Sequence, residues 1–108
     1  MREMNLSQLK TGMILELRNG KRFLTLIDTP TYRRGTIMIQ GTNLAVSMNG
    51  DEEQIDLIQY SYHLYHYGTQ REMDIMRVLL PKYPAQLFSG KDITLLTMWE
   101  REENRNSP

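Results

Sequence analysis

The stretch at residues 13–28 constrains the fold more than any other part of the chain. Two apolar-rich runs flank Arg18-Asn19-Gly20-Lys21, and Asn-Gly supplies the two positive-φ residues of a type I′ turn. We therefore predict a β-hairpin in which Arg18 lies opposite Lys21. This register places on one face, expected to be the core face, the pairs Leu17/Arg22, Leu15/Leu24 and Met13/Leu26, and on the other face Glu16/Phe23 and Ile14/Thr25.

A helical turn is predicted directly before the hairpin. Asn5 can cap this turn, Gln8 three residues later can complete a capping box, and Gly12 can end it. Leu6 and Leu9 then face inward. We expect the turn to cover one end of the β structure.

Turn signals and strand patterns alternate after the hairpin. Residues 28–35 have the proline, glycine and polar content of an exposed loop between strands. Residues 36–40 and 44–48 are predicted to be strands, from the alternation of Ile37 with Ile39 and the turn that follows them. Residues 49–53 contain Asn-Gly and three adjacent acids, which indicates a solvated turn.

The second half of the chain continues the β pattern. Residues 55–67 fit both helical and strand spacing, and we favour a short strand followed by a helical turn. Residues 73–80 are predicted as a strand, 81–90 as a loop with two prolines, and 93–101 as a closing strand. The predicted fold is therefore mostly β: a single domain at 1–101, with a short N-terminal helical turn, one short internal helix and a polar, frayed tail at 102–108.

Composition narrows the classes of function. The chain has 108 residues, the size of one domain, and its 13 basic side chains balance 13 acidic ones, so we do not expect duplex DNA as a partner. The absence of cysteine excludes disulfides, thiolate metal sites and a cysteine nucleophile. No stretch has the pattern of a signal peptide or a membrane span, so we expect a cytoplasmic protein without a membrane partner.

The opening of the chain also carries a family resemblance. Residues 9–20 follow the pattern L-K-x-G-M-x-x-x-L-R-N-G and resemble the opening of small phage and prophage proteins of Gram-positive bacteria. The stretches at 74–78 (D-I-M-R-V) and 98–101 (M-W-E-R) agree with that pattern in order and approximate spacing. The resemblance implies a small SH3-like β-barrel, a mobile-element origin and action in the cytoplasm of a host cell. It implies no catalytic residue.

Two groups of residues are candidates for ligand binding. Tyr32, Arg33 and Arg34 lie in the predicted loop, where guanidinium groups could hold phosphate oxygens while the ring stacks on a base; solvated charge is the alternative. The second group is a segment rich in tyrosine and histidine, with Tyr60, Tyr62, His63, Tyr65, His66 and Tyr67. Tyrosines in such a group suit recognition, or they close the barrel or a dimer seam. Two histidines three residues apart do not make a metal site by themselves.

These patterns predict a binding protein rather than an enzyme. Neither a nucleophile with its base nor a glycine-rich phosphate loop occurs in a recognisable arrangement, and no cofactor is expected. The first hypothesis is a phage-type protein that sequesters a nucleotide immune signal of the host through Tyr32, Arg33, Arg34, Tyr62, His63, Tyr65 and Tyr67. The second is a phage inhibitor or adaptor that binds a host protein, and the third is single-stranded nucleic-acid binding. Eight methionines and six tyrosines predict a homo-oligomer.

Overall fold

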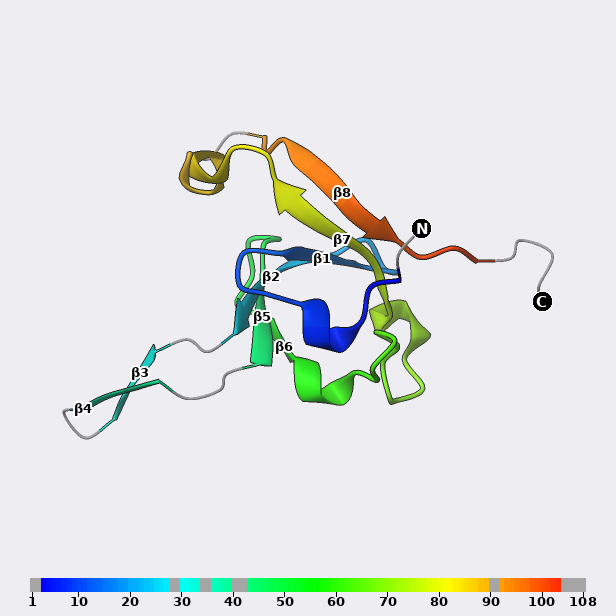
Figure 1. Ribbon diagram of the computed structural model, residues 1–108, viewed down its shortest axis with the longest axis horizontal. Helices are drawn as coiled ribbons and strands as arrows, with labels where there is room; N and C mark the ends of the chain where they lie inside the picture. The colour runs from blue at the N-terminus through cyan, green and yellow to red at the C-terminus, as the bar shows by residue number, and fades with distance from the viewer. Residues whose placement is uncertain (1–2, 28–29, 34–35, 40–42, 90–91, 104–108) are drawn as a thin grey trace.

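The computed structural model describes residues 3–27, 30–33, 36–39, 43–89 and 92–103, with the backbone alone at 30–33 and 36–39. A six-stranded antiparallel sheet forms its centre, in the order β6-β5-β2-β1-β7-β8 (Figure 1). Its strands are β1 (Ile14–Leu17), β2 (Arg22–Ile27), β5 (Asn43–Ser47), β6 (Gln54–Asp56), β7 (Ile75–Pro81) and β8 (Leu95–Glu100). The predicted mostly-β class is confirmed.

Short 3-10 helices connect the strands. They are η1 (Leu6–Gln8), η2 (Leu57–Gln59), η3 (Arg71–Met73) and η4 (Pro84–Phe88). In the part of the chain that the structure describes, no helix has the length and apolar character needed to cross a bilayer. The capping box predicted for the first turn is confirmed. The Asn5 side chain accepts the Gln8 backbone N–H, and the Gln8 side chain accepts the Asn5 backbone N–H at 3.0 Å.

The β1–β2 hairpin forms as predicted, but its turn is of a different type. Gly20 has a φ of +87°, whereas Asn19 is not among the described residues with positive φ. The Gly20 amide donates to the Leu17 carbonyl at 2.9 Å, and the Leu17 amide donates to the Lys21 carbonyl at 2.9 Å. This geometry is a three-residue loop with glycine in the left-handed region, so the predicted two-residue type I′ turn is wrong.

The longer loop shifts the pairing by one residue. Leu15 pairs with Phe23 and Glu16 with Arg22, instead of the predicted Leu15/Leu24 and Leu17/Arg22. A one-residue shift exchanges the two faces of a strand. Phe23 and Thr25 are therefore fully buried and Arg22 is exposed, which reverses the predicted faces of β2.

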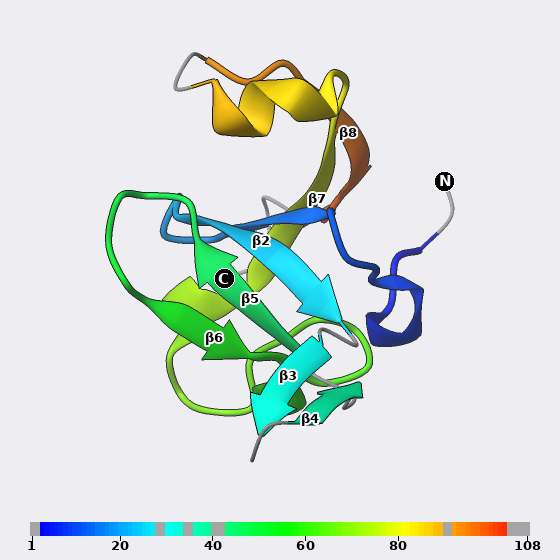
Figure 2. The same ribbon diagram turned by 90° about the vertical axis from the view of Figure 1, so that its left-hand side faces the viewer.

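The predicted loop at 28–35 is also wrong in part. It contains β3 (Pro30–Arg33), which pairs with β4 (Thr36–Ile39) in a separate two-stranded sheet. This β3–β4 hairpin projects from the main sheet as an arm, seen at the left of Figure 1 and at the front of Figure 2. Pro30 is the first residue of β3, a position at which a strand tolerates proline. A proline can therefore indicate either a loop or the start of a strand, and the sequence alone does not distinguish the two.

Most of the second half agrees with the sequence. β6 and η2 form the predicted short strand and helical turn, while β7 and β8 form the two predicted strands. The loop predicted at 81–90 instead contains η4. No described ladder joins the outer strands β6 and β8, so the SH3-like barrel remains a prediction. The main core includes fully buried Leu15, Phe23, Leu57, Leu64 and Val78.

Candidate functional site

The tyrosine and histidine segment folds as a tight loop held by the body of the protein. Tyr60 is buried, and its hydroxyl donates a hydrogen bond to the Met73 carbonyl at 2.6 Å. The backbone of Tyr60 bridges to His66, and the Tyr67 amide donates to the Gln59 carbonyl at 2.9 Å. The backbone path of this loop is therefore fixed by hydrogen bonds to the rest of the protein.

Asp74 connects this loop to the β1–β2 turn. Its carboxylate is almost fully buried and accepts the His66 amide at 2.8 Å and an Arg18 guanidinium N–H at 3.3 Å. Arg18 also makes a two-pronged contact with Glu103, with distances of 2.6 and 2.9 Å. The hydrogen bond from Arg18 holds the pKa of Glu103 below its usual range. Glu103, which we expected in a frayed tail, is thus anchored to the β1–β2 turn.

Tyr62 and Tyr67 border an uncharged groove of about 550 Å³, which we call the tyrosine groove. It also includes Ile58 of η2, and none of its lining residues carries a charge. Ile58 is 75% exposed, Tyr67 71% and Tyr62 54%, so three large side chains present apolar surface together. Two further lining residues are Ile27 and Asn43, which pair where the chain leaves and re-enters the main sheet. The groove therefore lies at the base of the β3–β4 arm.

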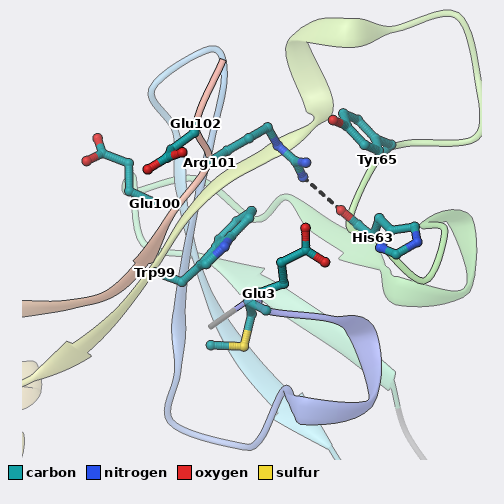
Figure 3. Close-up of a pocket in the computed structure, with 8 residues that line it drawn as sticks. Glu3, His63, Tyr65, Trp99, Glu100, Arg101 and Glu102 are labelled. Atoms are coloured by element: carbon teal, nitrogen blue, oxygen red, sulfur yellow. Dashed lines mark hydrogen bonds between the residues drawn. The ribbon is translucent and has the colours of Figure 1, made fainter. Parts of the chain in front are cut away.

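His63 and Tyr65 line a different cavity, of about 590 Å³, together with Trp99 and Arg101 (Figure 3). The Arg101 guanidinium carbon lies 3.9 Å from the centre of the Tyr65 ring and 5.0 Å from that of Trp99. The same guanidinium donates to the His63 carbonyl at 2.9 Å and to the Ile75 carbonyl at 2.9 and 3.2 Å. Arg101 thus fastens the loop to the end of β8.

The charge of this second cavity disfavours an anionic ligand. Three of its lining residues are Glu3, Glu100 and Glu102, against the single guanidinium of Arg101. A phosphate group would meet more negative than positive charge there. We therefore do not assign a nucleotide phosphate to this cavity.

The structure divides the predicted binding residues. It brings Tyr62 and Tyr67 together in the tyrosine groove and places His63 and Tyr65 in the acidic cavity. Tyr32 and Arg33 belong to β3, where only the backbone is described, and Arg34 lies outside the described residues.

Sequence analysis missed Ile58 as a surface residue. The Asp56 carboxylate caps η2 by accepting the Ile58 amide at 3.1 Å, and the tight turn leaves Ile58 exposed. An aspartate two residues before an apolar residue is the only local signal of this arrangement.

Metal binding and known relatives offer no further assignment. Within the described ranges, no three histidine, aspartate or glutamate side chains are grouped so that they could hold a metal ion. Comparison of the chain with protein-family models, with curated proteins and with solved structures gave no match.

Proposed function

We propose that this chain is a non-enzymatic binding protein whose tyrosine groove receives an apolar, uncharged segment of another protein. The observation that carries the proposal is the combination of an uncharged lining with three large exposed side chains, Ile58, Tyr62 and Tyr67. Contiguous apolar surface of this kind marks interaction sites, and tyrosine is enriched among residues that dominate binding energy. A charged partner side chain would lose water in the groove without gaining an opposite charge.

The β3–β4 arm extends the proposed surface. Because Ile27 and Asn43 line the groove at the base of the arm, a partner in the groove lies beside the arm as well. The arm contains Tyr32 and Arg33 in its sequence, two residue types that are common in protein interfaces. The resemblance to phage proteins makes a host protein the partner we propose, with this chain as its inhibitor or adaptor.

The proposal is tested first by photo-crosslinking. A photoreactive amino acid in place of Tyr67 should form one dominant adduct with a host protein. The same amino acid in place of Phe88, which is 91% exposed on η4, serves as the matched position and should not form that adduct.

Binding to the purified partner then tests the groove quantitatively. Ile58→Asp should weaken binding at least about tenfold, because it places a charge where the partner removes water. Phe88→Asp adds the same charge on η4 and should leave the affinity unchanged. Equal losses for the two variants would contradict the proposal.

Nucleotide capture is a second candidate, and the position of the arm supports it. A base could stack on Tyr62 or Tyr67 while Arg33 and Arg34, the two arginines in the sequence at the end of β3 and directly after it, hold phosphate oxygens. Calorimetric titration with linear and cyclic nucleotides should then show binding, weakened about ten- to a hundredfold by the double change Arg33→Ala and Arg34→Ala. Absence of binding by the wild-type protein would reject this candidate, and turnover of a nucleotide would contradict a non-enzymatic function.

A further inference from the structure

We propose that His66 is a pH-sensitive latch on the tyrosine groove: as the pH falls, its side chain takes up a proton, the bend at residues 66–68 opens, and partner binding weakens. The inference rests on the proposed function, because it concerns the regulation of the same groove. His66 is partly buried and lines neither of the two cavities described above. Its contacts give it a role that the proposed function does not yet use.

The imidazole of His66 accepts a hydrogen bond, which defines its protonation state. The Gly68 amide donates to Nδ1 of His66 at 3.1 Å. A ring nitrogen that accepts an N–H carries no proton, so this contact assigns a neutral imidazole with its proton on Nε2. A Cβ added at Gly68 would lie 3.1 Å from both Nδ1 and Cε1 of the ring. The ring therefore packs directly against the backbone of the bend.

This hydrogen bond is one of two that restrain the chain around Tyr67. On one side, the Tyr67 amide donates to the Gln59 carbonyl at 2.9 Å. On the other side, the bond between Gly68 and His66 closes the bend. The His66 ring also packs edge-to-face on Tyr60, which lines the groove, with ring centres 5.2 Å apart. His66 thus contacts one tyrosine of the groove and restrains another.

Protonation removes the acceptor that closes the bend. Histidine side chains in general take up a proton as the pH falls from about 8 to about 5. The proton comes from water and binds Nδ1, which then becomes a donor and faces a second donor, the Gly68 N–H. The hydrogen bond is lost, and the Tyr67 backbone keeps only its bond to Gln59. A partner must then order Tyr67 when it binds, at a cost in conformational entropy.

The charged and titratable groups around His66 do not restore the lost hydrogen bond. The Asp74 carboxylate accepts the backbone amide of His66 at 2.8 Å and is paired with Arg18, so the two opposite charges act on the ring together. Burial raises the pKa of Tyr60 above its ordinary value of 10.0, so Tyr60 stays neutral over the range in which histidine titrates. The charge state of His66 therefore decides whether the bend is closed.

NMR spectroscopy of the free protein tests the latch without a partner. At about pH 8 the imidazole nitrogen shifts of His66 should show an unprotonated Nδ1, and at about pH 5.5 the Gly68 amide should shift and the backbone order parameter of Tyr67 should fall. His66→Asn keeps a side-chain acceptor for the Gly68 amide but cannot titrate, so it should abolish both responses. The matched change His63→Asn removes the other of the chain's 2 histidines and should preserve them.

Binding of the host protein identified by crosslinking at Tyr67 tests the consequence for the groove. The wild-type affinity should fall about three- to tenfold more than that of His66→Asn between about pH 8 and about pH 5.5. The comparison of the two proteins cancels the titration of the partner's own groups.

Two results would overturn the latch: a protonated Nδ1 at about pH 8, or equal responses of wild type and His66→Asn to pH in either experiment. Failure of both proteins to bind at any pH would instead contradict the proposed function. The NMR readings on the free protein would still decide whether His66 controls the bend, so the two proposals fail separately.

Discussion

At the residue scale, Gly20 tests the corrected turn. Its φ of +87° is strained for any other residue, although no atom within 4 Å obstructs an added Cβ. Gly20→Val should therefore lower the free energy of unfolding by more than about 1 kcal/mol through backbone strain alone. Denaturant unfolding gives the value.

Asn19 provides the matched control in the same turn. In a type I′ turn Asn19 also needs a positive φ, but here its side-chain oxygen accepts the Lys21 amide at 2.9 Å and its own amide donates to the Glu72 carbonyl at 3.0 Å. Asn19→Ala should cost about 0.5 to 1.5 kcal/mol. If Asn19→Gly stabilised the protein markedly, Asn19 would have the positive φ of the two-residue turn instead.

Thr25 provides a second test at the residue scale, because its buried hydroxyl is not hydrogen-bonded to any described residue. Its side chain is fully buried on β2, and its hydroxyl has no hydrogen-bond partner among the described residues. Thr25→Val keeps the branched shape and removes the unsatisfied group, so it should raise the free energy of unfolding by about 1 kcal/mol. The same change at exposed Thr97 should have little effect on the free energy of unfolding. Destabilisation by Thr25→Val would show that the hydroxyl is hydrogen-bonded in solution.

At the element scale, the hairpin shows what local pattern can and cannot predict. The Asn-Gly signal correctly indicates a reversal of the chain between β1 and β2. It fits both two-residue and three-residue loops, and the apolar positions of β2 do not decide between them, because Phe23, Leu24 and Leu26 stand on both faces. The register was therefore beyond reach from the sequence, whereas the capping box at Asn5 and Gln8 was predictable because its contacts are local.

The candidate site was predictable only as a segment. The concentration of tyrosines marked the segment, but it did not indicate that Tyr60 is buried while Tyr62 and Tyr67 are exposed and share a groove. Their separation from His63 and Tyr65 depends on long-range contacts, such as Arg101 with the His63 carbonyl. No local spacing reports a contact between residues that far apart in the sequence.

Tyr60 links the loop at 60–67 to η3, and pH tests this link. Burial raises the pKa of Tyr60 above its ordinary value of 10.0. The unfolded chain therefore loses the phenolic proton first, so the stability that neutral Tyr60 contributes is fully present below pH 10 and declines as the pH rises above it.

The expected result compares two proteins across that pH range. At pH 7, Tyr60→Phe should lower the free energy of unfolding by about 1 kcal/mol, because the hydrogen bond to the Met73 carbonyl is lost. From pH 9 to 11 the difference between wild type and variant should shrink. A difference that stays constant would mean that Tyr60 is solvated in the folded protein.

At the scale of the whole molecule, the tyrosine groove and β8 lie apart. β8 lies at the upper border of the molecule in Figure 1, whereas η2, which contributes Ile58 to the groove, lies below the main sheet. A partner bound in the groove is therefore expected to leave β8 uncovered.

Hydrogen–deuterium exchange on the complex with the crosslinked partner tests most directly whether the tyrosine groove is the binding surface. Partner binding should slow exchange in residues 57–67 and at Ile27 and Asn43, which line the groove. Exchange in η4 should stay as it is in the free protein. Slower exchange confined to β7, β8 and η4, with residues 57–67 unchanged, would contradict the proposed function.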